Sequence, residues 1–306
     1  MAHKQSFINY QISRDKKQNN HRMNLLKLLL SLIFLVLTSE TWGQSQLRIE
    51  NNLMYTDVDL SDGGLVHKVS AMIDTGSSVC MIDSTFAIDS CHIKRVDGDR
   101  SMGNTYGRDV KSSYFYLDSL SIAGVCYPKV WCFVVDLVGK LQRFAPKFIV
   151  GGDLLKRGMW MFDMINKKIM PCAAVPDHAT VTLHSKNYTD AAMNHIYFKG
   201  KIGGHSTRIL FDTGATRNEL TTDFNVSTND TIAIKQANIA QKLTYNNRVG
   251  LCKNLPVEIS KLHFYVDFIK PREGGYKYPR INTNFLQDKR WVLDYKHRSV
   301  YIMLSD

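Results

Sequence analysis

The strongest constraint on the fold is that one pattern occurs twice in the chain. Residues 70–78 read SAMIDTGSS, and residues 208–216 read RILFDTGAT. In both copies an apolar run leads into Asp-Thr-Gly, and a phenylalanine, Phe86 or Phe224, follows twelve residues after the aspartate. A repeat that keeps its register in this way predicts that one structural unit is duplicated.

A second pair of blocks follows in the same order. Residues 149–155 read IVGGDLL and residues 280–286 read RINTNFL, and a tryptophan stands five residues after the last leucine of each block. We expect these tryptophans, Trp160 and Trp291, to lie in the core. Two ordered blocks at similar separation predict two lobes of the same fold.

The coarse pattern of each half is rich in strands. Turn signals of Gly and Asp separate runs of β-branched and aromatic residues. The expected strands are 54–60 with 65–73, 114–122 with 130–135, and 196–202 with 206–211. Short helices are expected at 84–88, at 153–157 and at the equivalent positions of the second half. We therefore predict an all-β fold with an N-terminal lobe at 44–178 and a C-terminal lobe at 179–306, linked through 173–190.

The N-terminus has the pattern of a targeting segment. Residues 25–37 form an apolar run that contains Lys27, and the small residues Thr41 and Gly43 follow it. This run is shorter than the roughly 20 residues of a transmembrane helix. It predicts a signal peptide cleaved near Gly43/Gln44, export to a periplasmic or external space, and no stable membrane span afterwards. An uncleaved anchor is the alternative, and Met23 is an alternative start.

The charge of the chain does not point to nucleic acid. Lys and Arg number 39 against 28 Asp and Glu, a formal charge of +11. Without residues 1–43 the excess falls to +7, and no run of five or more basic residues occurs. Because nucleic-acid binding needs clustered basic residues, we expect none.

Metal and cofactor motifs are missing from the sequence. The six cysteines form no CxxC pair, and no HExxH spacing occurs among the ten histidines. We expect no metal and no cofactor. An even number of cysteines in an exported chain permits disulfides, and Cys80 with Cys91 is the pair most easily closed.

The two Asp-Thr-Gly loops suggest a specific chemistry. Gly lets backbone amides approach a carboxylate, and Thr can hydrogen-bond to the opposite loop. Two such loops can bring Asp74 and Asp212 close enough to share one proton, because like charges at that distance do not both ionise. The ionised carboxylate can then take a proton from water while the protonated one polarises a carbonyl.

The pattern resembles the aspartic peptidases of the pepsin and retropepsin group. The resemblance covers most of residues 50–304 and rests on the paired Asp-Thr-Gly motifs and on the later block Ile149-Val150-Gly151, which in that family passes behind the aspartate loop. The chain looks like two retropepsin-like units duplicated in one exported polypeptide. The resemblance implies two pseudo-symmetric closed-barrel lobes, a substrate cleft between them and flaps over the cleft.

Carried over residue by residue, the resemblance makes Asp74 and Asp212 the catalytic pair. The active-site loops are then shaped by Thr75, Gly76, Ser77, Thr213, Gly214 and Ala215. The flap of the first lobe is expected in 97–108, with Gly103, Tyr106 and Gly107 at or near its tip. Its counterpart in the second lobe is expected around 241–248.

Two departures from the family pattern set further expectations. Asn282 stands where the later block has Gly in the first lobe, so its side chain is expected to crowd or bend the loop behind Asp212. Ala215 stands where the first lobe has Ser77, whose hydroxyl is expected to hydrogen-bond to Asp74. Because such a bond stabilises the charged carboxylate, the sequence predicts Asp74 as the more readily ionised member and Asp212 as the more readily protonated one.

The resulting hypothesis is an exported aspartic endopeptidase that acts on a peptide or protein substrate. With both lobes in one chain, we expect a monomer. One alternative is a catalytically silent relative that binds peptides or proteins in the same cleft, and another is an enzyme that acts on itself or on one dedicated partner. A single Asp-Thr-Gly is often a surface turn, and the matched pair is what argues against that interpretation.

Overall fold

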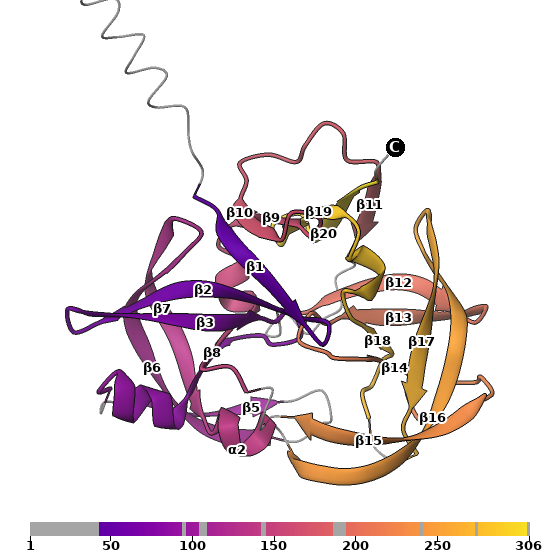
Figure 1. The fold of residues 1–306 in the computed structure, drawn as a ribbon, viewed down its shortest axis with the longest axis horizontal. Helices are drawn as coiled ribbons and strands as arrows, with labels where there is room; N and C mark the ends of the chain where they lie inside the picture. The colour runs from indigo at the N-terminus through magenta and orange to yellow at the C-terminus, as the bar shows by residue number, and fades with distance from the viewer. Residues whose placement is uncertain are drawn as a thin grey trace, which may run out of the picture. The chain divides into compact units, whose positions relative to one another are not determined.

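The computed structural model describes residues 43–93, 96–103, 109–141, 145–185, 194–238, 241–272 and 275–304. It is built mostly of β-strands, which make up 56% of it (Figure 1). The all-β prediction is therefore confirmed. Within the described ranges, no helix is long and apolar enough to cross a membrane.

Within the described residues the strands fall into two series of ten. The first series is β1 (Ser45–Glu50), β2 (Leu53–Asp62), β3 (Leu65–Ile73), β4 (Cys80–Asp83), β5 (Gly98–Gly103), β6 (Asp109–Ile122), β7 (Val125–Val135), β8 (Phe148–Val150), β9 (Met159–Asp163) and β10 (Lys168–Pro171). The second is β11 (Val181–His184), β12 (Ile196–Ile202), β13 (His205–Phe211), β14 (Asn218–Glu219), β15 (Asp230–Asn238), β16 (Gln241–Ile259), β17 (Leu262–Lys270), β18 (Arg280–Ile281), β19 (Arg290–Asp294) and β20 (Ser299–Met303). The short helices are η1 (Phe86–Ser90), α2 (Leu137–Leu141), α3 (Gly152–Leu155) and η3 (Asn284–Leu286).

Each strand of the first series corresponds to the strand of the second series whose label is higher by ten, as β2 corresponds to β12. The strands β2-β3-β8-β4-β7-β6 are paired in this order, and β6 returns to β2. The strands β12-β13-β18-β14-β17-β16 repeat the order, and β16 returns to β12. Each lobe is thus a closed six-stranded barrel, as predicted. Both barrels lie in one compact unit, Gly43–Asp306.

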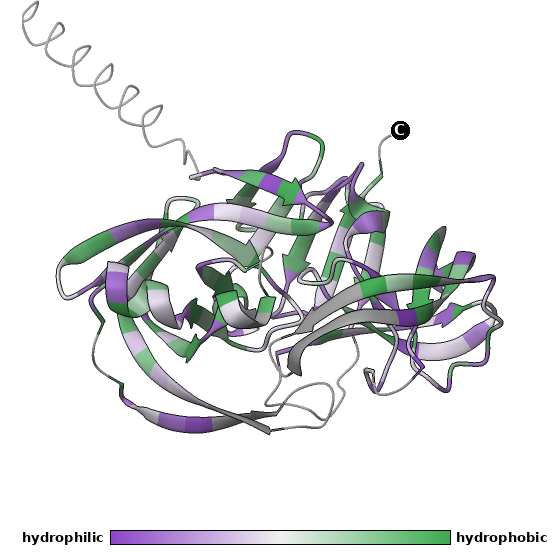
Figure 2. Ribbon diagram, turned by 60° about the horizontal axis from the view of Figure 1, so that its bottom comes forward, coloured by the Kyte–Doolittle hydropathy of each residue, from purple (hydrophilic) through white to green (hydrophobic). Residues whose placement is uncertain are grey.

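The first hairpin of each barrel shows why the sequence folds in this way. β2 alternates between buried and more exposed residues, the pattern of a strand with one face on the core. Figure 2 shows hydrophobic and hydrophilic residues interspersed along the strands. A two-glycine turn joins the strands of each hairpin, with φ of 55° and 81° at Gly63 and Gly64 and 57° and 83° at Gly203 and Gly204. Two consecutive positive φ values form the tight turn that matches the twist of the flanking strands.

A sheet shared by both lobes was not foreseen from the sequence. Its order is β11-β20-β19-β9-β10-β1, so β9 of the first lobe pairs directly with β19 of the second. β11 lies inside the segment predicted to link the lobes. The lobe boundary predicted between residues 178 and 179 precedes β11 and stays a prediction.

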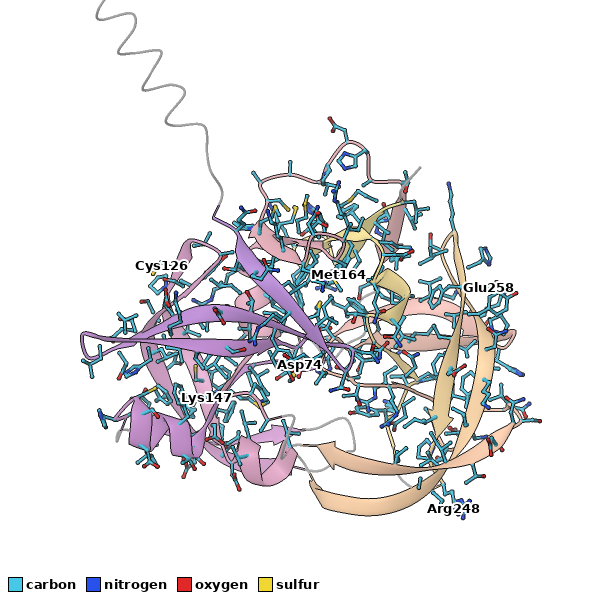
Figure 3. The ribbon with its side chains drawn as sticks, viewed as in Figure 1. Asp74, Cys126, Lys147, Met164, Arg248 and Glu258 are labelled. Atoms are coloured by element: carbon cyan, nitrogen blue, oxygen red, sulfur yellow. The ribbon has the colours of Figure 1, made fainter. Side chains whose placement is uncertain are left out.

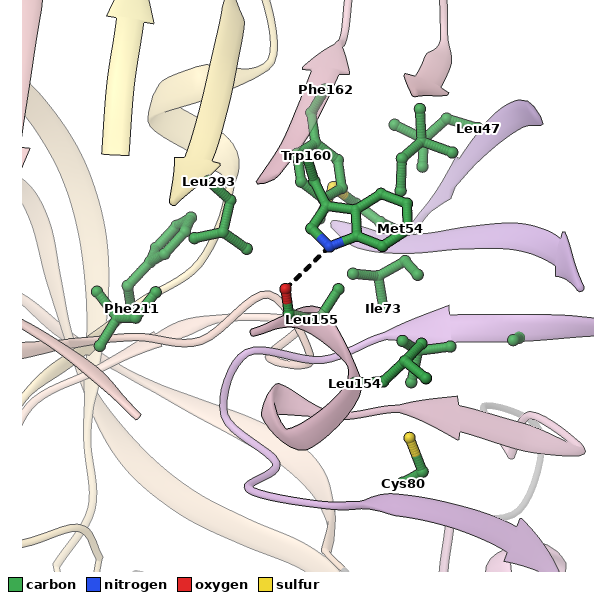
Figure 4. Packing of buried hydrophobic residues seen from close by; sticks show 14 of the residues in the cluster. Leu47, Met54, Ile73, Cys80, Leu154, Leu155, Trp160, Phe162, Phe211 and Leu293 are labelled. Atoms are coloured by element: carbon green, nitrogen blue, oxygen red, sulfur yellow. Dashed lines mark hydrogen bonds between the residues drawn. The ribbon is translucent and has the colours of Figure 1, made fainter. Parts of the chain in front are cut away.

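The tryptophans of the repeat occupy the core, as the sequence predicts. Trp160 and Trp291 are fully buried, and the ring of Trp291 stacks on Phe162 with centroids 4.1 Å apart. The Trp160 indole donates a hydrogen bond of 2.9 Å to the Leu155 carbonyl at the end of α3 (Figure 4). This contact ties the strands of the shared sheet to the segment that passes behind the first aspartate loop.

Two local expectations need correction. The helix expected at 84–88 is η1, but its second-lobe equivalent at 222–226 is not helical. There the carbonyls of Phe224 and Val226 accept hydrogen bonds from the Lys270 ammonium. Cys80 and Cys91 are free thiols, like the other four cysteines. The Cys80 thiol donates instead to the Asp153 carboxylate over 3.3 Å.

Candidate active site

Both Asp-Thr-Gly loops lie where the two barrels meet. Asp74 directly follows β3 and lies near the middle of the molecule (Figure 3). Its backbone N–H donates to Val150 over 3.0 Å, and the Asp212 N–H donates to Ile281 over 2.9 Å. β8 and β18 therefore pass behind the loops in parallel with β3 and β13, as the later sequence blocks predict.

The two threonines hydrogen-bond across the lobes in a reciprocal pattern. The Thr75 hydroxyl accepts from the Thr213 N–H at 3.1 Å and donates to the Phe211 carbonyl at 2.8 Å. The Thr213 hydroxyl accepts from the Thr75 N–H at 3.0 Å and donates to the Ile73 carbonyl at 2.7 Å. Both threonines are fully buried. Each loop thus supplies the partners for buried backbone groups of the other.

The glycines let the two carboxyl groups approach each other. A Cβ at Gly76 would lie 2.4 Å from Asp212 Oδ1, and a Cβ at Gly214 would lie 2.3 Å from Asp74 Cγ. Real Cβ atoms essentially never come so close to another heavy atom. Each aspartate therefore occupies the space that a side chain on the opposite loop would need.

Backbone amides hold each carboxylate. Asp74 Oδ1 accepts from the N–H of Gly76 at 2.8 Å and of Ser77 at 3.1 Å. Asp212 Oδ1 accepts from the Gly214 N–H at 3.0 Å. These donors fix the plane of each side chain.

The prediction for the Ser77 hydroxyl is wrong. It donates to the Val79 carbonyl over 2.8 Å and not to Asp74. The serine contributes its backbone N–H to the Asp74 carboxylate, and the Ala215 N–H donates to the Asp212 backbone carbonyl. The presence of Ser77 in one loop and Ala215 in the other therefore does not set the asymmetry of the pair.

Arg280 creates a different asymmetry, which the sequence analysis missed. Its guanidinium donates to Asp212 Oδ2 over 2.9 Å and to Glu219 Oε2 over 2.9 Å. It also donates to the Tyr276 hydroxyl over 2.7 Å and lies over that ring, 4.2 Å from its centroid. The signal was present in the repeat, since charged residues stand at 219 and 280 where the first copy has Met81 and Ile149.

The Asp74 carboxyl holds its proton more firmly than an ordinary aspartate does. Burial, and next the nearby Asp212 carboxylate, raise the pKa of Asp74 from 3.8 to about 8, against the opposing effects of the Gly76 and Ser77 N–H groups and Arg280. This direction is opposite to the lowered pKa that a Ser77 hydroxyl bond was expected to give Asp74. The reason is that burial next to a second carboxylate outweighs the hydrogen bonds.

Asn282 is accommodated without displacing the loop. A Cβ at Gly151, its counterpart, would lie 2.2 Å from the Val79 carbonyl oxygen. Asn282 is fully buried, its N–H donates to Asn218 Oδ1, and its own Oδ1 accepts from the Asn284 N–H. The expected crowding is thus absorbed by a local turn, and the hydrogen bond between Asp212 and Ile281 is retained.

The flap expected in the first lobe falls only partly within the described residues. Gly103 ends β5, which pairs with β6 in an antiparallel hairpin. Tyr106 and Gly107 lie outside the described residues, so their expected role stays a prediction. In the second lobe the equivalent hairpin is β15–β16, and residues 241–248 begin its second strand.

Metal ligands do not gather in the part of the chain that the structure describes. No group of three or more His, Cys, Asp or Glu side chains there is arranged to hold a metal ion. The chemistry available at the meeting point of the loops is that of two carboxyl groups and one guanidinium.

Residues 57–154 match the model of a family described as aspartyl protease. This part of the chain is similar to aspartyl proteases. The match contains β3, the loop of Asp74 and β8 behind it, and the second barrel repeats the same topology. No curated protein matches the chain at significant similarity.

Replacing Thr213 by valine should destabilise the protein. The change leaves the buried Ile73 carbonyl and Thr75 N–H without partners, and each such group costs about 1–3 kcal/mol. We expect Thr213→Val to lower the free energy of unfolding by about 2–4 kcal/mol in urea titrations. Thr213→Ser retains the hydroxyl and should lose much less. Equal losses in the two variants would contradict the role given to the hydroxyl.

Replacing Asp74 by asparagine should change how stability depends on pH. Because the folded pKa of Asp74 lies above its ordinary value, the folded protein keeps a proton that the unfolded chain loses, and stability falls as pH rises from about 4 to about 8. Asn is neutral throughout this window. The difference in unfolding free energy, variant minus wild type, should therefore rise by at least about 1.4 kcal/mol between pH 4 and pH 7. An unchanged difference between the two proteins across that range would show that Asp74 titrates normally.

Proposed function

We propose that the chain is an exported aspartic endopeptidase that hydrolyses peptide bonds with the Asp74–Asp212 pair. The observation that carries the proposal is the juxtaposition of two carboxyl groups on loops locked together by reciprocal threonine hydrogen bonds. The aspartyl protease match of the first lobe supports a peptide as the substrate class.

The asymmetry of the pair assigns the roles in the first step. Asp212, ion-paired with Arg280, acts as the general base and takes a proton from the attacking water. The water oxygen bonds to the carbonyl carbon while Asp74 donates its proton to the carbonyl oxygen. A neutral tetrahedral diol results, and Asp74 is left ionised.

The second step returns the protons. The diol collapses, the C–N bond breaks, and the leaving nitrogen takes the proton held by Asp212. A hydroxyl of the diol gives its proton back to Asp74 as the new carboxyl group forms. The pair then again holds one proton in total, ready for the next substrate.

Cleavage by the purified chain beginning at Gln44 tests the proposal. On a mixed peptide library, we expect Asp74→Asn and Asp212→Asn each to lower kcat/KM by at least about a thousandfold, because each carboxyl needs the other. A statine-type peptide, whose hydroxyl mimics the tetrahedral intermediate, should inhibit the wild type, whereas a metal chelator should not. The control Ser77→Ala retains the backbone donor to Asp74 and should remain active.

Near-normal cleavage by either aspartate variant would reject the shared pair. A wild type that binds the statine peptide but cleaves nothing would favour the second candidate, a silent peptide-binding relative. The buried ion pair between Arg280 and Asp212 is the observation that keeps this candidate open.

Export is the part of the proposal that rests on the sequence alone. The apolar run at 25–37 and the small residues that follow motivate it. Expression in a secreting host should yield a product whose N-terminus is Gln44, as read by N-terminal sequencing. An intact leader on membrane-bound protein would point to an anchor instead.

A further inference from the structure

One further difference between the two lobes is a matched pair of positions on the strands next to the aspartate loops. In the first lobe β4 and β8 pair antiparallel with Met81 opposite Ile149. In the second lobe β14 and β18 pair in the same way with Glu219 opposite Arg280. An apolar pair in one copy of the unit is thus replaced by an ion pair in the other.

The ion pair is well buried. The side chains of Arg280, Asp212 and Glu219 are 15%, 7% and 0% exposed. One guanidinium nitrogen bridges Asp212 and the Tyr276 hydroxyl, and the other contacts Glu219. Glu219 and Tyr276 thereby fix the guanidinium in the position from which it contacts Asp212.

Stability alone does not account for this cluster. Burying ions costs desolvation free energy, and an apolar pair of similar volume is often as stable or more so. The first lobe shows that this unit accommodates Met and Ile at the same register. The effect that the apolar pair cannot supply is a positive charge against one carboxylate.

We propose that Arg280 is a positioning residue that holds Asp212 as the ionised member of the pair and leaves the proton on Asp74. This inference rests on the proposed function and deepens it. The guanidinium stabilises the Asp212 carboxylate, so the state with one proton on the pair persists to lower pH than it would between two carboxyl groups alone. Arg280 touches neither water nor peptide in this role and acts only through Asp212.

Other titratable groups surround the pair. Asp74 faces Asp212 from the loop after β3, and Tyr295, whose pKa is raised by burial, interacts with Asp74 and Asp153 from the end of β19. Glu219 and Tyr276 contact Arg280, and Arg157 acts on Asp153. Arg280 is a cation in direct contact with a carboxylate of the pair.

The test transplants the apolar pair of the first lobe into the second. Glu219→Met with Arg280→Ile removes one charge of each sign and reproduces a pairing that the fold already contains. We expect the acid limb of the kcat/KM profile to move to higher pH by about one unit or more, because kcat/KM reports the free enzyme. Arg280→Lys keeps the charge but not the forked geometry, and its acid limb should lie between the two.

A matched control removes a different arginine. Arg208 lies on β13 and donates to the Tyr278 hydroxyl over 3.0 Å. Arg208→Met should leave the acid limb where it is in the wild type. A shift in this control as large as in the double variant would overturn the specific role of Arg280.

A second readout does not depend on activity. Protein labelled with ¹³C at the aspartate carboxyls reports each titration, and the resonance that is lost in Asp212→Asn identifies Asp212. As the pH is lowered, this resonance should become that of a protonated carboxyl at a lower pH in the wild type than in the double variant. An identical titration in both folded proteins would overturn the proposal. A double variant more active than the wild type at every pH would also overturn it, because Arg280 would then be an inhibitory contact. If the wild type cleaves no peptide, the proposed function fails, and the titration still decides the role of Arg280.

Discussion

The crossed hydrogen bonds of Thr75 and Thr213 are the interaction on which the rest of the site depends. Each hydroxyl satisfies a buried N–H of the other threonine and a buried carbonyl at the end of the opposite strand, β3 or β13. Buried backbone groups without partners are costly, so neither loop is complete without the other. Gly76 and Gly214 then leave room for the facing carboxylates, and the two half-sites become one.

Much of this arrangement is predictable because it is encoded locally and twice. The apolar run before each Asp-Thr-Gly predicts a strand ending at Asp74 or Asp212, and the paired glycines at 63–64 and 203–204 predict the hairpin turns. A repeat also fixes which segments correspond, so the passage of β8 behind one loop predicts that of β18 behind the other. Fold class and the meeting of the two aspartates follow from these signals.

What the sequence did not predict depends on where a side chain points or which distant strand it meets. The Ser77 hydroxyl donates to the Val79 carbonyl and not to the Asp74 carboxylate. Sequence spacing does not distinguish between these two nearby acceptors. The pairing of β9 with β19 joins segments more than a hundred residues apart. Arg280 drew no prediction from the sequence, and only the fold shows that it contacts Asp212. The difference between two copies of a unit is therefore as informative as their agreement.

We propose that the two loops hold one proton between them, on Asp74, with Asp212 ionised against Arg280. Neutron diffraction from crystals of the deuterated protein near neutral pH would locate that proton directly. We expect a deuterium on an Asp74 carboxyl oxygen, none on Asp212, and a fully deuterated guanidinium in contact with Asp212. A deuterium on Asp212, or a pair with no deuterium at all, would contradict it.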